Sequence, residues 1–170
     1  ATLLRGFAKE KVIAVAPGAR WITKEWPPEF FAETLNLFCR DHHDYSFVIL
    51  GSPSEKPLGE RLRSALKAPS LNLIGLTGIA ELVEAIRRSR LLLCNDSGPM
   101  HIAAALGTPL TALFGPTDPV LTGPFSDRAE VLTAPVDCVK CFKRECAGSG
   151  CHAAISAAAV KKSMEKMLGL

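Results

Sequence analysis

The sequence predicts an α/β protein built on an open, doubly wound, mostly parallel six-stranded sheet. Short apolar runs alternate with longer segments of helical periodicity, the pattern of parallel strands joined by helical crossovers. The short runs are apolar throughout, as expected of strands covered by helices on both faces. Polar motifs follow four of these runs, where ligands bind in such sheets.

Six strands and five helices make up the prediction. The predicted strands are 11–17, 45–51, 71–75, 90–95, 109–115 and 129–134, and the predicted helices are 27–42, 54–68, 78–89, 98–106 and 152–169.

The first β-α-β-α unit is predicted as follows. The β-branched run 11–17 is a strand, and helical spacing follows over 27–42, with Pro28 suited to the first turn. Gly51 closes the strand 45–51. The helix 54–68 is amphipathic, with a weak start because Pro57 and Gly59 lie near it. Five apolar residues are expected along one side of the first helix: Phe30, Phe31, Leu35, Leu37 and Phe38.

The second half repeats the alternation. The strand 71–75 precedes the helix 78–89, which we expect to direct Ile79, Leu82, Val83 and Ile86 inward. After the strand 90–95, Ser97 is a good N-cap, Pro99 suits the first turn, and Gly107 ends the helix 98–106. The strands 109–115 and 129–134 and a closing helix 152–169 complete the sheet.

Composition favours one globular domain over residues 1–170. The chain has 170 residues, of which 48% are hydrophobic, enough to bury a core. A net charge of +3 and 6% aromatic residues disfavour nucleic-acid binding. No apolar run of about 18 residues appears. The N-terminus lacks a secretion signal, and its abrupt opening on a strand suggests a piece of a longer protein.

The segment from Asp96 to His101 predicts an anion site. The backbone N–H groups of Ser97 and Gly98 begin a helix, where partial positive charge favours phosphate. His101 lies one turn further and is suited to donate to a phosphate oxygen. A carboxylate beside phosphate would repel it, so Asp96 should face a hydroxyl-bearing part of the ligand. The alternative is that Asp96 and Ser97 only cap the helix and His101 lies on the surface.

Two further polar residues follow the first two strands. Lys24, between Trp21 and Trp26, is suited to reach a phosphate as a point charge, or it is an ordinary surface lysine with Trp26 as a core anchor. Glu55 lies where nucleotide-binding sheets often place an acid on ribose, or it only favours a helix start. The motifs G-x-G-x-x-G, G-x-x-x-x-G-K-[ST] and G-x-S-x-G are absent.

Four motifs in order resemble one family. PGARWITKEWP, LIGLTGIAEL, NDSGPMHIAAALGTPLTALFGPTDP and CVKCFKREC are similar to the C-terminal half of glycosyltransferase family 9, the bacterial lipopolysaccharide heptosyltransferases, and look most like the heptosyltransferase II type. The resemblance runs from about Lys11 to the last helix. It implies a two-domain GT-B enzyme whose C-terminal, Rossmann-like half binds ADP-heptose.

The resemblance also implies roles for single residues. Lys24 would contact the diphosphate, Glu55 the ribose, and Thr77 would lie where adenine is held. Asp96 would hold the heptose hydroxyls. Three residues would surround the phosphates: Ser97, Gly98 and His101. The general base would belong to the N-terminal half, which this sequence lacks, so no catalytic residue is assigned here and the chain alone should be inactive.

Two positions depart from the family pattern. Leu76 stands where many members carry lysine, and Gly78 where many carry serine, and either change would alter the grip on adenine.

A cysteine-rich loop over 134–152 leaves its chemistry open. Cys138 and Cys141 form a C-x2-C pair suited to zinc, but the next two spacings, to Cys146 and Cys151, are looser, with His152 as a substitute ligand. Structural zinc, free thiols and a pair oxidised on purification are the alternatives. Cys39 and Cys94 lie in apolar patterns and should be buried.

Taken together, the sequence predicts the ADP-heptose-binding half of an inverting heptosyltransferase of lipopolysaccharide core assembly. The acceptor, the lipopolysaccharide core, would bind through the missing half. We expect a cytoplasmic protein without nucleic-acid partners, in peripheral contact with the inner face of the membrane through Lys140, Lys143 and Arg144. The alternatives are a non-catalytic nucleotide- or sugar-phosphate-binding module and a metal-stabilised interaction domain.

Overall fold

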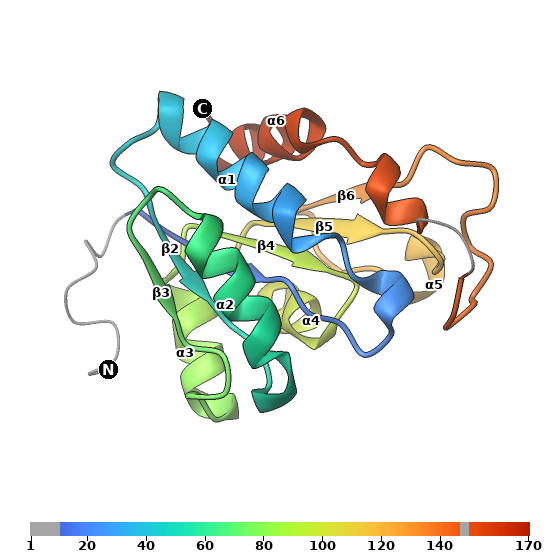
Figure 1. The fold of residues 1–170 in the computed structure, drawn as a ribbon, viewed down its shortest axis with the longest axis horizontal. Helices are drawn as coiled ribbons and strands as arrows, with labels where there is room; N and C mark the ends of the chain where they lie inside the picture. The colour runs from blue at the N-terminus through green and yellow to red at the C-terminus, as the bar shows by residue number, and fades with distance from the viewer. Residues whose placement is uncertain (1–10, 147–149) are drawn as a thin grey trace.

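A computed structural model of the chain describes residues 11–146 and 150–170 (Figure 1). The strands are β1 Val12–Ala16, β2 Ser46–Ile49, β3 Ser70–Asn72, β4 Leu91–Asn95, β5 Leu110–Phe114 and β6 Ala129–Thr133. The α-helices are α1 Pro28–Asp41, α2 Lys56–Ala65, α3 Ile79–Arg88, α4 Gly98–Leu106, α5 Pro119–Thr122 and α6 Ala157–Leu168. Three 3-10 turns are η1 Ile22–Lys24, η2 Pro53–Glu55 and η3 Cys151–Ala154.

The strands form one six-stranded sheet in the order β3-β2-β1-β4-β5-β6, and every neighbouring pair is parallel. The chain builds outward from β1 to β3 and then returns to place β4 on the other side of β1. The strand order therefore reverses between β1 and β4, and their carboxyl ends border the crevice where such sheets bind ligands. The predicted doubly wound sheet is confirmed.

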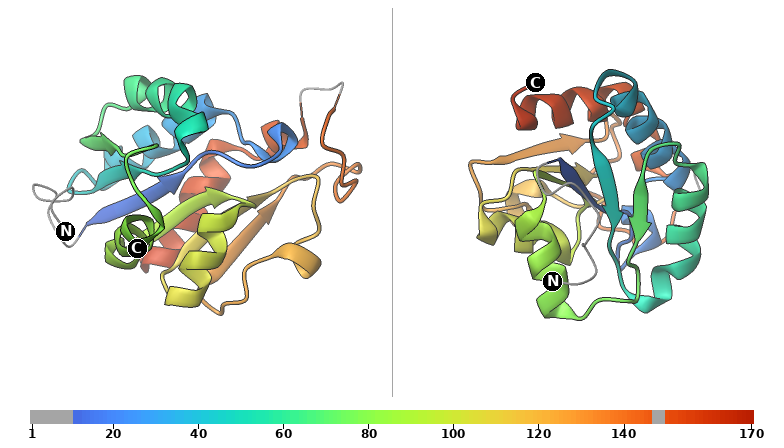
Figure 2. Two further views of the ribbon diagram at one scale, coloured as in Figure 1. Left: turned by 90° about the horizontal axis from the view of Figure 1, so that it is seen from below. Right: turned by 90° about the vertical axis from the view of Figure 1, so that its left-hand side faces the viewer.

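Helices cover both faces of the sheet, with α1, α2 and α6 on one face and α3 and α4 on the other (Figures 1 and 2). Successive residues of β1 serve the two cores in turn: Ile13 and Val15 pack under the first group, and Val12, Ala14 and Ala16 under the second. Because both faces are buried, the strand has no polar position, which explains the uninterrupted apolar run.

The first predicted helix is confirmed together with its apolar side. Phe31, Leu35 and Phe38 of α1 are fully buried, and Phe30 and Leu37 pack partly buried against the same core. Pro28 is the first residue of the helix, as expected.

Most elements are somewhat shorter than predicted, and two of them show a physical reason. β3 ends at Asn72 rather than residue 75, and Gly75 turns the chain with a φ of +70°, a conformation that glycine adopts without strain. The last helix begins at Ala157 rather than residue 152. The Ser156 hydroxyl accepts a hydrogen bond from the Ala159 N–H and fixes this start, and η3 forms a separate turn before it.

The prediction that Ile79 points inward is wrong. Ile86 is fully buried under the sheet, but the side chain of Ile79 is 78% exposed at the first turn of α3. The helix starts at the carboxyl edge of the sheet, so its first turn reaches beyond the core. Two short elements, α5 and η1, were also not predicted; the Asp118 side chain caps α5 by accepting from the Val120 N–H.

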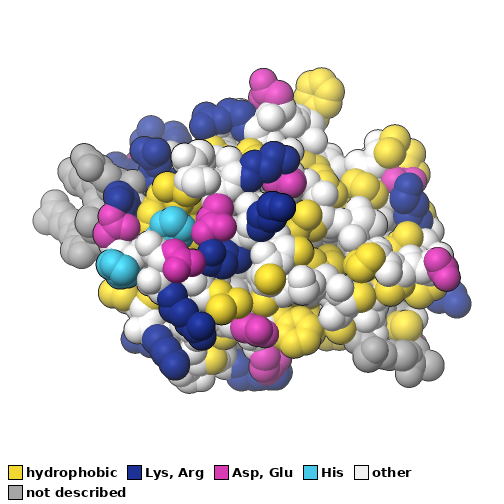
Figure 3. Space-filling view, turned by 90° about the horizontal axis from the view of Figure 1, so that it is seen from above, with side chains coloured by type: hydrophobic (Ala, Val, Ile, Leu, Met, Phe, Trp, Pro, Cys, Tyr) yellow, Lys and Arg dark blue, Asp and Glu magenta, His cyan; other side chains and the backbone are white. Residues whose placement is uncertain are grey.

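The face over α1 and α6 carries interspersed acidic and basic side chains (Figure 3). Lys161 is paired with Asp41 at 2.8 Å and with Glu165 at 2.6 Å, and His42 lies 2.9 Å from Glu165. The mixture of signs is that of an ordinary solvated surface rather than a one-signed binding face. Within the described part of the chain, no helix is long and apolar enough to cross a membrane.

Substitution of one buried and one exposed phenylalanine tests the burial of the core. Phe31→Ala should lower the free energy of unfolding by about 3–5 kcal/mol, because it leaves a cavity under the sheet. Phe125→Ala, at a side chain that is 101% exposed, is the matched control and should leave the urea midpoint nearly unchanged. Equal losses in urea unfolding of the two variants would contradict the burial described here.

Candidate functional site

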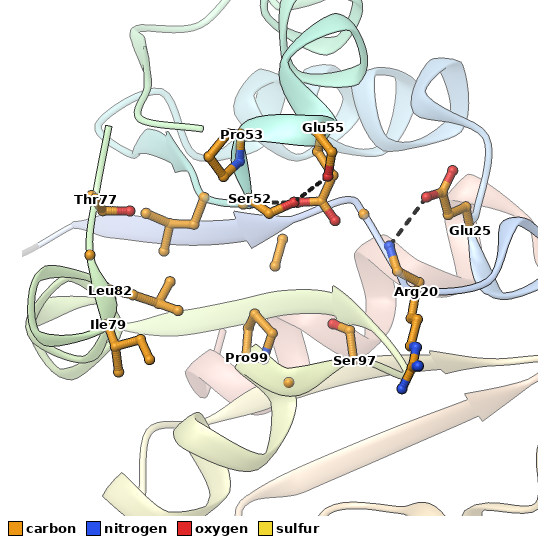
Figure 4. A pocket seen from close by; sticks show the side chains of 18 residues that line it. Arg20, Glu25, Ser52, Pro53, Glu55, Thr77, Ile79, Leu82, Ser97 and Pro99 are labelled. Carbon is orange, nitrogen blue, oxygen red and sulfur yellow. Dashed lines mark hydrogen bonds between the residues drawn. The ribbon is translucent and has the colours of Figure 1, made fainter. Parts of the chain in front are cut away.

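A cavity of about 760 Å³ opens at the carboxyl ends of β1, β2 and β4 (Figure 4). Four segments line it: 16–20 together with Glu25, 50–55, 77–82 and 97–99. These segments follow the strands on either side of the reversal in strand order, so the topology alone brings them together.

The lining changes character from one end of the cavity to the other. Thr77, Ile79 and Leu82 lie at one end, and Arg20 and Glu25 at the other (Figure 4). Between them, the wall formed by 52–55 faces the start of α4. The exposed Ile79 side chain thus belongs to the apolar end of the cavity. An apolar end followed by polar walls suits a ligand with a flat apolar ring and a polar tail.

Two glycines make room for the Glu55 carboxylate. A Cβ on Gly18 would lie 2.1 Å from Oε1 of Glu55, and a Cβ on Gly51 would lie 2.4 Å from Oε2. The Ser52 N–H donates to Oε2 at 2.6 Å in a capping box. Glu55 therefore both caps the turn, as the alternative held, and presents its carboxylate to the cavity, as the ribose hypothesis requires.

Asp96 and Lys24 lie against each other beside this cavity. The Lys24 ammonium donates to Oδ2 of Asp96 at 2.6 Å, and the Thr117 hydroxyl donates to the same oxygen at 2.6 Å. The two charged side chains are only 15% and 5% exposed. Lys24 is thus neither a surface lysine nor among the residues lining the cavity, and the sequence did not reveal that it pairs with Asp96.

Buried side chains hold the loop that carries Lys24 against the core. Trp26 is fully buried, packs edge-on against Phe31 and donates its indole N–H to the Ile155 carbonyl at 3.2 Å. The buried Asn95 side chain accepts from the Trp26 N–H at 3.2 Å and donates to the Pro17 carbonyl at 2.7 Å. Trp26 is therefore the core anchor that one alternative proposed. Asn95, which sequence reasoning passed over, ties the end of β4 to the loop after β1.

The two aromatic neighbours of Lys24 differ in position. Trp21 stays partly exposed, and the Lys24 ammonium lies 4.6 Å from the centre of its ring. Cation–π contact adds to the ion pair in holding the ammonium in place.

The start of α4 faces the cavity through Ser97, Gly98 and Pro99. Ser97 occupies the N-cap position, but its hydroxyl donates to the Asn95 carbonyl at 3.2 Å instead of capping the helix. Asp96 is likewise engaged elsewhere, so the capping alternative does not describe these side chains. His101 is exposed, as the alternative expected, and is not among the residues that line the cavity.

Two charged residues of the cavity, Glu25 and Arg20, were missed by sequence reasoning. Glu25 accepts a hydrogen bond from the Ala19 N–H at 3.3 Å, and burial raises the pKa of its carboxyl, as does the charge of Glu55. Arg20 stands on the same loop. Both belong to PGARWITKEWP, the motif singled out for Lys24, so the position of the loop was predicted but the choice of residues within it was not.

The described part of the cysteine-rich loop does not gather a metal site. In residues 11–146 and 150–170, no group of three or more His, Cys, Asp or Glu side chains is placed to hold a metal ion, so zinc is not supported. Cys138, Cys141 and Cys146 are exposed thiols, and Cys151 packs against Gly115, where an added Cβ would lie 2.4 Å from its Sγ. Residues 147–149 of the loop lie outside the described residues.

His152 makes a structural contact between two turns. Its Nδ1–H donates to the Thr23 carbonyl at 3.1 Å, which joins η3 to η1, and burial lowers the pKa of the imidazole. Cys94 is fully buried, as expected, whereas Cys39 is only half-buried, and burial raises the pKa of Cys39 to about 11.

The family model for glycosyltransferase family 9 (heptosyltransferase) matches residues 2–152. The chain belongs to this family. Lipooligosaccharide heptosyltransferase 2 of Haemophilus influenzae is 37% identical over 126 residues, which are 71% of this chain and 36% of that relative. Lipopolysaccharide heptosyltransferase 2 of Escherichia coli is 35% identical over 130 residues, 74% of this chain and 37% of that protein.

Solved structures of family 9 share the fold. The structure of the E. coli ADP-heptose lps heptosyltransferase II aligns with a TM-score of 0.81 at 28% identity, over 98% of this chain and 50% of that one. A glycosyl transferase family 9 protein of Veillonella parvula aligns at 0.85 and 28% identity, over 98% of this chain and 49% of that one. This family 9 chain therefore spans about half of those structures and less than half of the curated relatives above.

The pair of Asp96 and Lys24 predicts a large effect on stability. Asp96→Ala should lower the free energy of unfolding by about 3–5 kcal/mol, because it leaves the Lys24 ammonium buried without its partner. The double variant with Lys24→Ala should lose less than the sum of the two single losses. Asp44→Ala, in the exposed pair with Lys11, is the control and should barely move the urea midpoint. Additive losses would mean that the two charges do not interact.

Proposed function

We propose that this chain is the nucleotide-sugar-binding half of an inverting heptosyltransferase, which transfers heptose from ADP-heptose to the inner core of lipopolysaccharide. It would be the C-terminal half of a two-domain GT-B enzyme and a single domain over residues 1–170. The observation that carries the proposal is the cavity at the strand-order reversal, with the Glu55 carboxylate on one wall and the start of α4 on the other. Family membership favours transfer over a non-catalytic binding module.

The nucleoside would occupy the apolar end and the middle of the cavity. The ring of adenine would lie among Thr77, Ile79 and Leu82, which line this end of the cavity, and backbone groups near Thr77 would hold it. Glu55 would accept hydrogen bonds from the ribose hydroxyls. Its Oε2 already binds the Ser52 N–H, which orients the carboxylate, and a carboxylate has acceptor capacity for further donors.

The diphosphate would lie against Ser97 and Gly98, where the N–H groups and dipole of α4 favour negative charge. Lys24 would contribute from beside the cavity: its ammonium has three N–H donors and uses one on Asp96. His101, one turn further along α4, would approach the phosphates from outside the present lining.

The heptose would follow the diphosphate towards Asp96. Both hydrogen bonds to this carboxylate go to Oδ2, and the described residues donate none to Oδ1. Oδ1 would accept from the heptose hydroxyls in charge-assisted bonds. The hydrogen bonds from Lys24 and Thr117 hold the carboxylate in place.

Transfer would proceed by attack of an acceptor hydroxyl on the anomeric carbon, with ADP as the leaving group. Negative charge that develops on the diphosphate would be stabilised by the α4 N-terminus and by Lys24. The general base and the acceptor site would belong to the half of the enzyme that this sequence does not contain.

The same proposal places the enzyme in the cytoplasm, at the inner face of the membrane. Lys143 and Arg144 are exposed, and Lys140 is exposed although paired with Asp118 at 3.1 Å. Cations on such a loop are attracted to anionic lipid headgroups and to acceptor phosphates.

Calorimetry with ADP and UDP tests the nucleotide assignment. We expect ADP to bind much more tightly than UDP, and Glu55→Gln to weaken ADP by about 10-fold through loss of a charge-assisted bond. Glu33→Gln, on the exposed side of α1, is the matched control and should bind ADP like the unaltered chain. Equal affinity for ADP and UDP would contradict the adenine assignment.

The chain alone should bind the donor and transfer nothing. Incubated with ADP-heptose and a core acceptor, it should yield no heptosylated product by mass spectrometry, because base catalysis and alignment of the acceptor each contribute orders of magnitude to the rate. Turnover at rates normal for an enzyme would show that this half carries its own base.

A further inference from the structure

The charges that line the cavity do not suit a diphosphate unless one residue balances them. Among the lining residues, Glu25 and Glu55 are acids and Arg20 is the cation. Two carboxylates in one cavity repel a ligand that carries two phosphates. A cation inside the same cavity is therefore needed where the phosphates lie.

Lys24 meets this need only in part. Its ammonium is 2.6 Å from the Asp96 carboxylate, which offsets its charge, and it stands outside the lining. Arg20, by contrast, takes part in none of the ion pairs found among residues 11–146 and 150–170. Its guanidinium is thus the uncommitted positive charge of the cavity.

The position of Arg20 also fits. Its side chain points away from Glu25 and towards the side of the cavity on which Ser97 lies (Figure 4). The hydrogen bond from the Ala19 N–H to Glu25, at 3.3 Å, holds the backbone next to it. A guanidinium presents a planar fork of donors that matches two phosphate oxygens, which an ammonium cannot do.

We infer that Arg20 binds the diphosphate of the nucleotide ligand opposite Ser97 and Gly98, and that Glu25 holds the loop which presents it. The inference rests on the proposed function, because it takes the cavity to be the nucleotide site. It adds to Lys24 a second phosphate-binding residue within the motif PGARWITKEWP.

Calorimetry with ADP, adenosine and inorganic pyrophosphate tests this role. Arg20→Ala should weaken ADP and pyrophosphate by about 10- to 100-fold and adenosine by less than about 2-fold, because only the first two offer phosphate oxygens. The ADP and pyrophosphate affinities of Arg20→Lys should lie between those of the unaltered chain and of Arg20→Ala, since lysine keeps the positive charge but lacks the planar fork of donors. Raising the salt concentration should weaken ADP more in the unaltered chain than in Arg20→Ala.

Arg63→Ala is the matched control: this arginine is exposed on α2, away from the cavity, and its removal should leave all three affinities unchanged. Thermal melting followed by circular dichroism should show that each variant is folded. ADP and pyrophosphate affinities within about 2-fold of the unaltered chain in Arg20→Ala would overturn the role of Arg20 and leave the proposed function standing. Failure of the unaltered chain to bind ADP or pyrophosphate would overturn both.

Discussion

The buried carboxylate of Asp96 is the constraint around which the carboxyl edge of this sheet is arranged. A carboxylate that is 5% exposed is costly to the fold unless it is paired and hydrogen-bonded. Lys24 reaches it from the loop after β1, and Thr117 from the loop after β5. The need to pair this one charge at the end of β4 thus sets the positions of two other loops. The strand order reverses between β1 and β4, so two of the three segments that meet at Asp96 follow the strands that flank the reversal.

The same edge depends on close backbone approach. Gly18 and Gly51 leave the space that the Glu55 carboxylate fills, so the loops after β1 and β2 are close enough for one side chain to bridge them. Asn95 adds a second bridge, from the end of β4 to Pro17 and Trp26. Hydrogen bonds within the protein therefore hold the walls of the cavity in place, and Asn95 does so from outside the lining.

Lys24 and Arg20 differ in their roles because Lys24 is mostly buried and Arg20 is exposed. Lys24 serves first to neutralise Asp96, and it is suited to assist a ligand because an ammonium has donors to spare. Arg20 lies on the same loop, is exposed, and forms no ion pair within the described residues. These roles explain why the loop between β1 and α1 is longer than a strand–helix connection needs. One part of it is anchored in the core through Trp26, and another part faces the cavity.

The sequence by itself determined the fold class and the loops of the site, because apolar periodicity and polar residues at strand ends are local signals. It placed α1 with its buried side, the order of the six strands along the chain, Glu55 and the start of α4. It did not show that Lys24 would form an ion pair with Asp96 or that Ile79 would line the cavity. Nor did it show that Arg20 would line the cavity or that Asn95 would bond to the loop after β1. Those facts join residues far apart in the chain: Lys24 and Asp96 are 72 positions apart, and Asn95 and Pro17 are 78 apart. Only the packing of the chain decides which charge meets which, because electrostatic and hydrogen-bond partners depend on distance in space rather than on spacing in sequence.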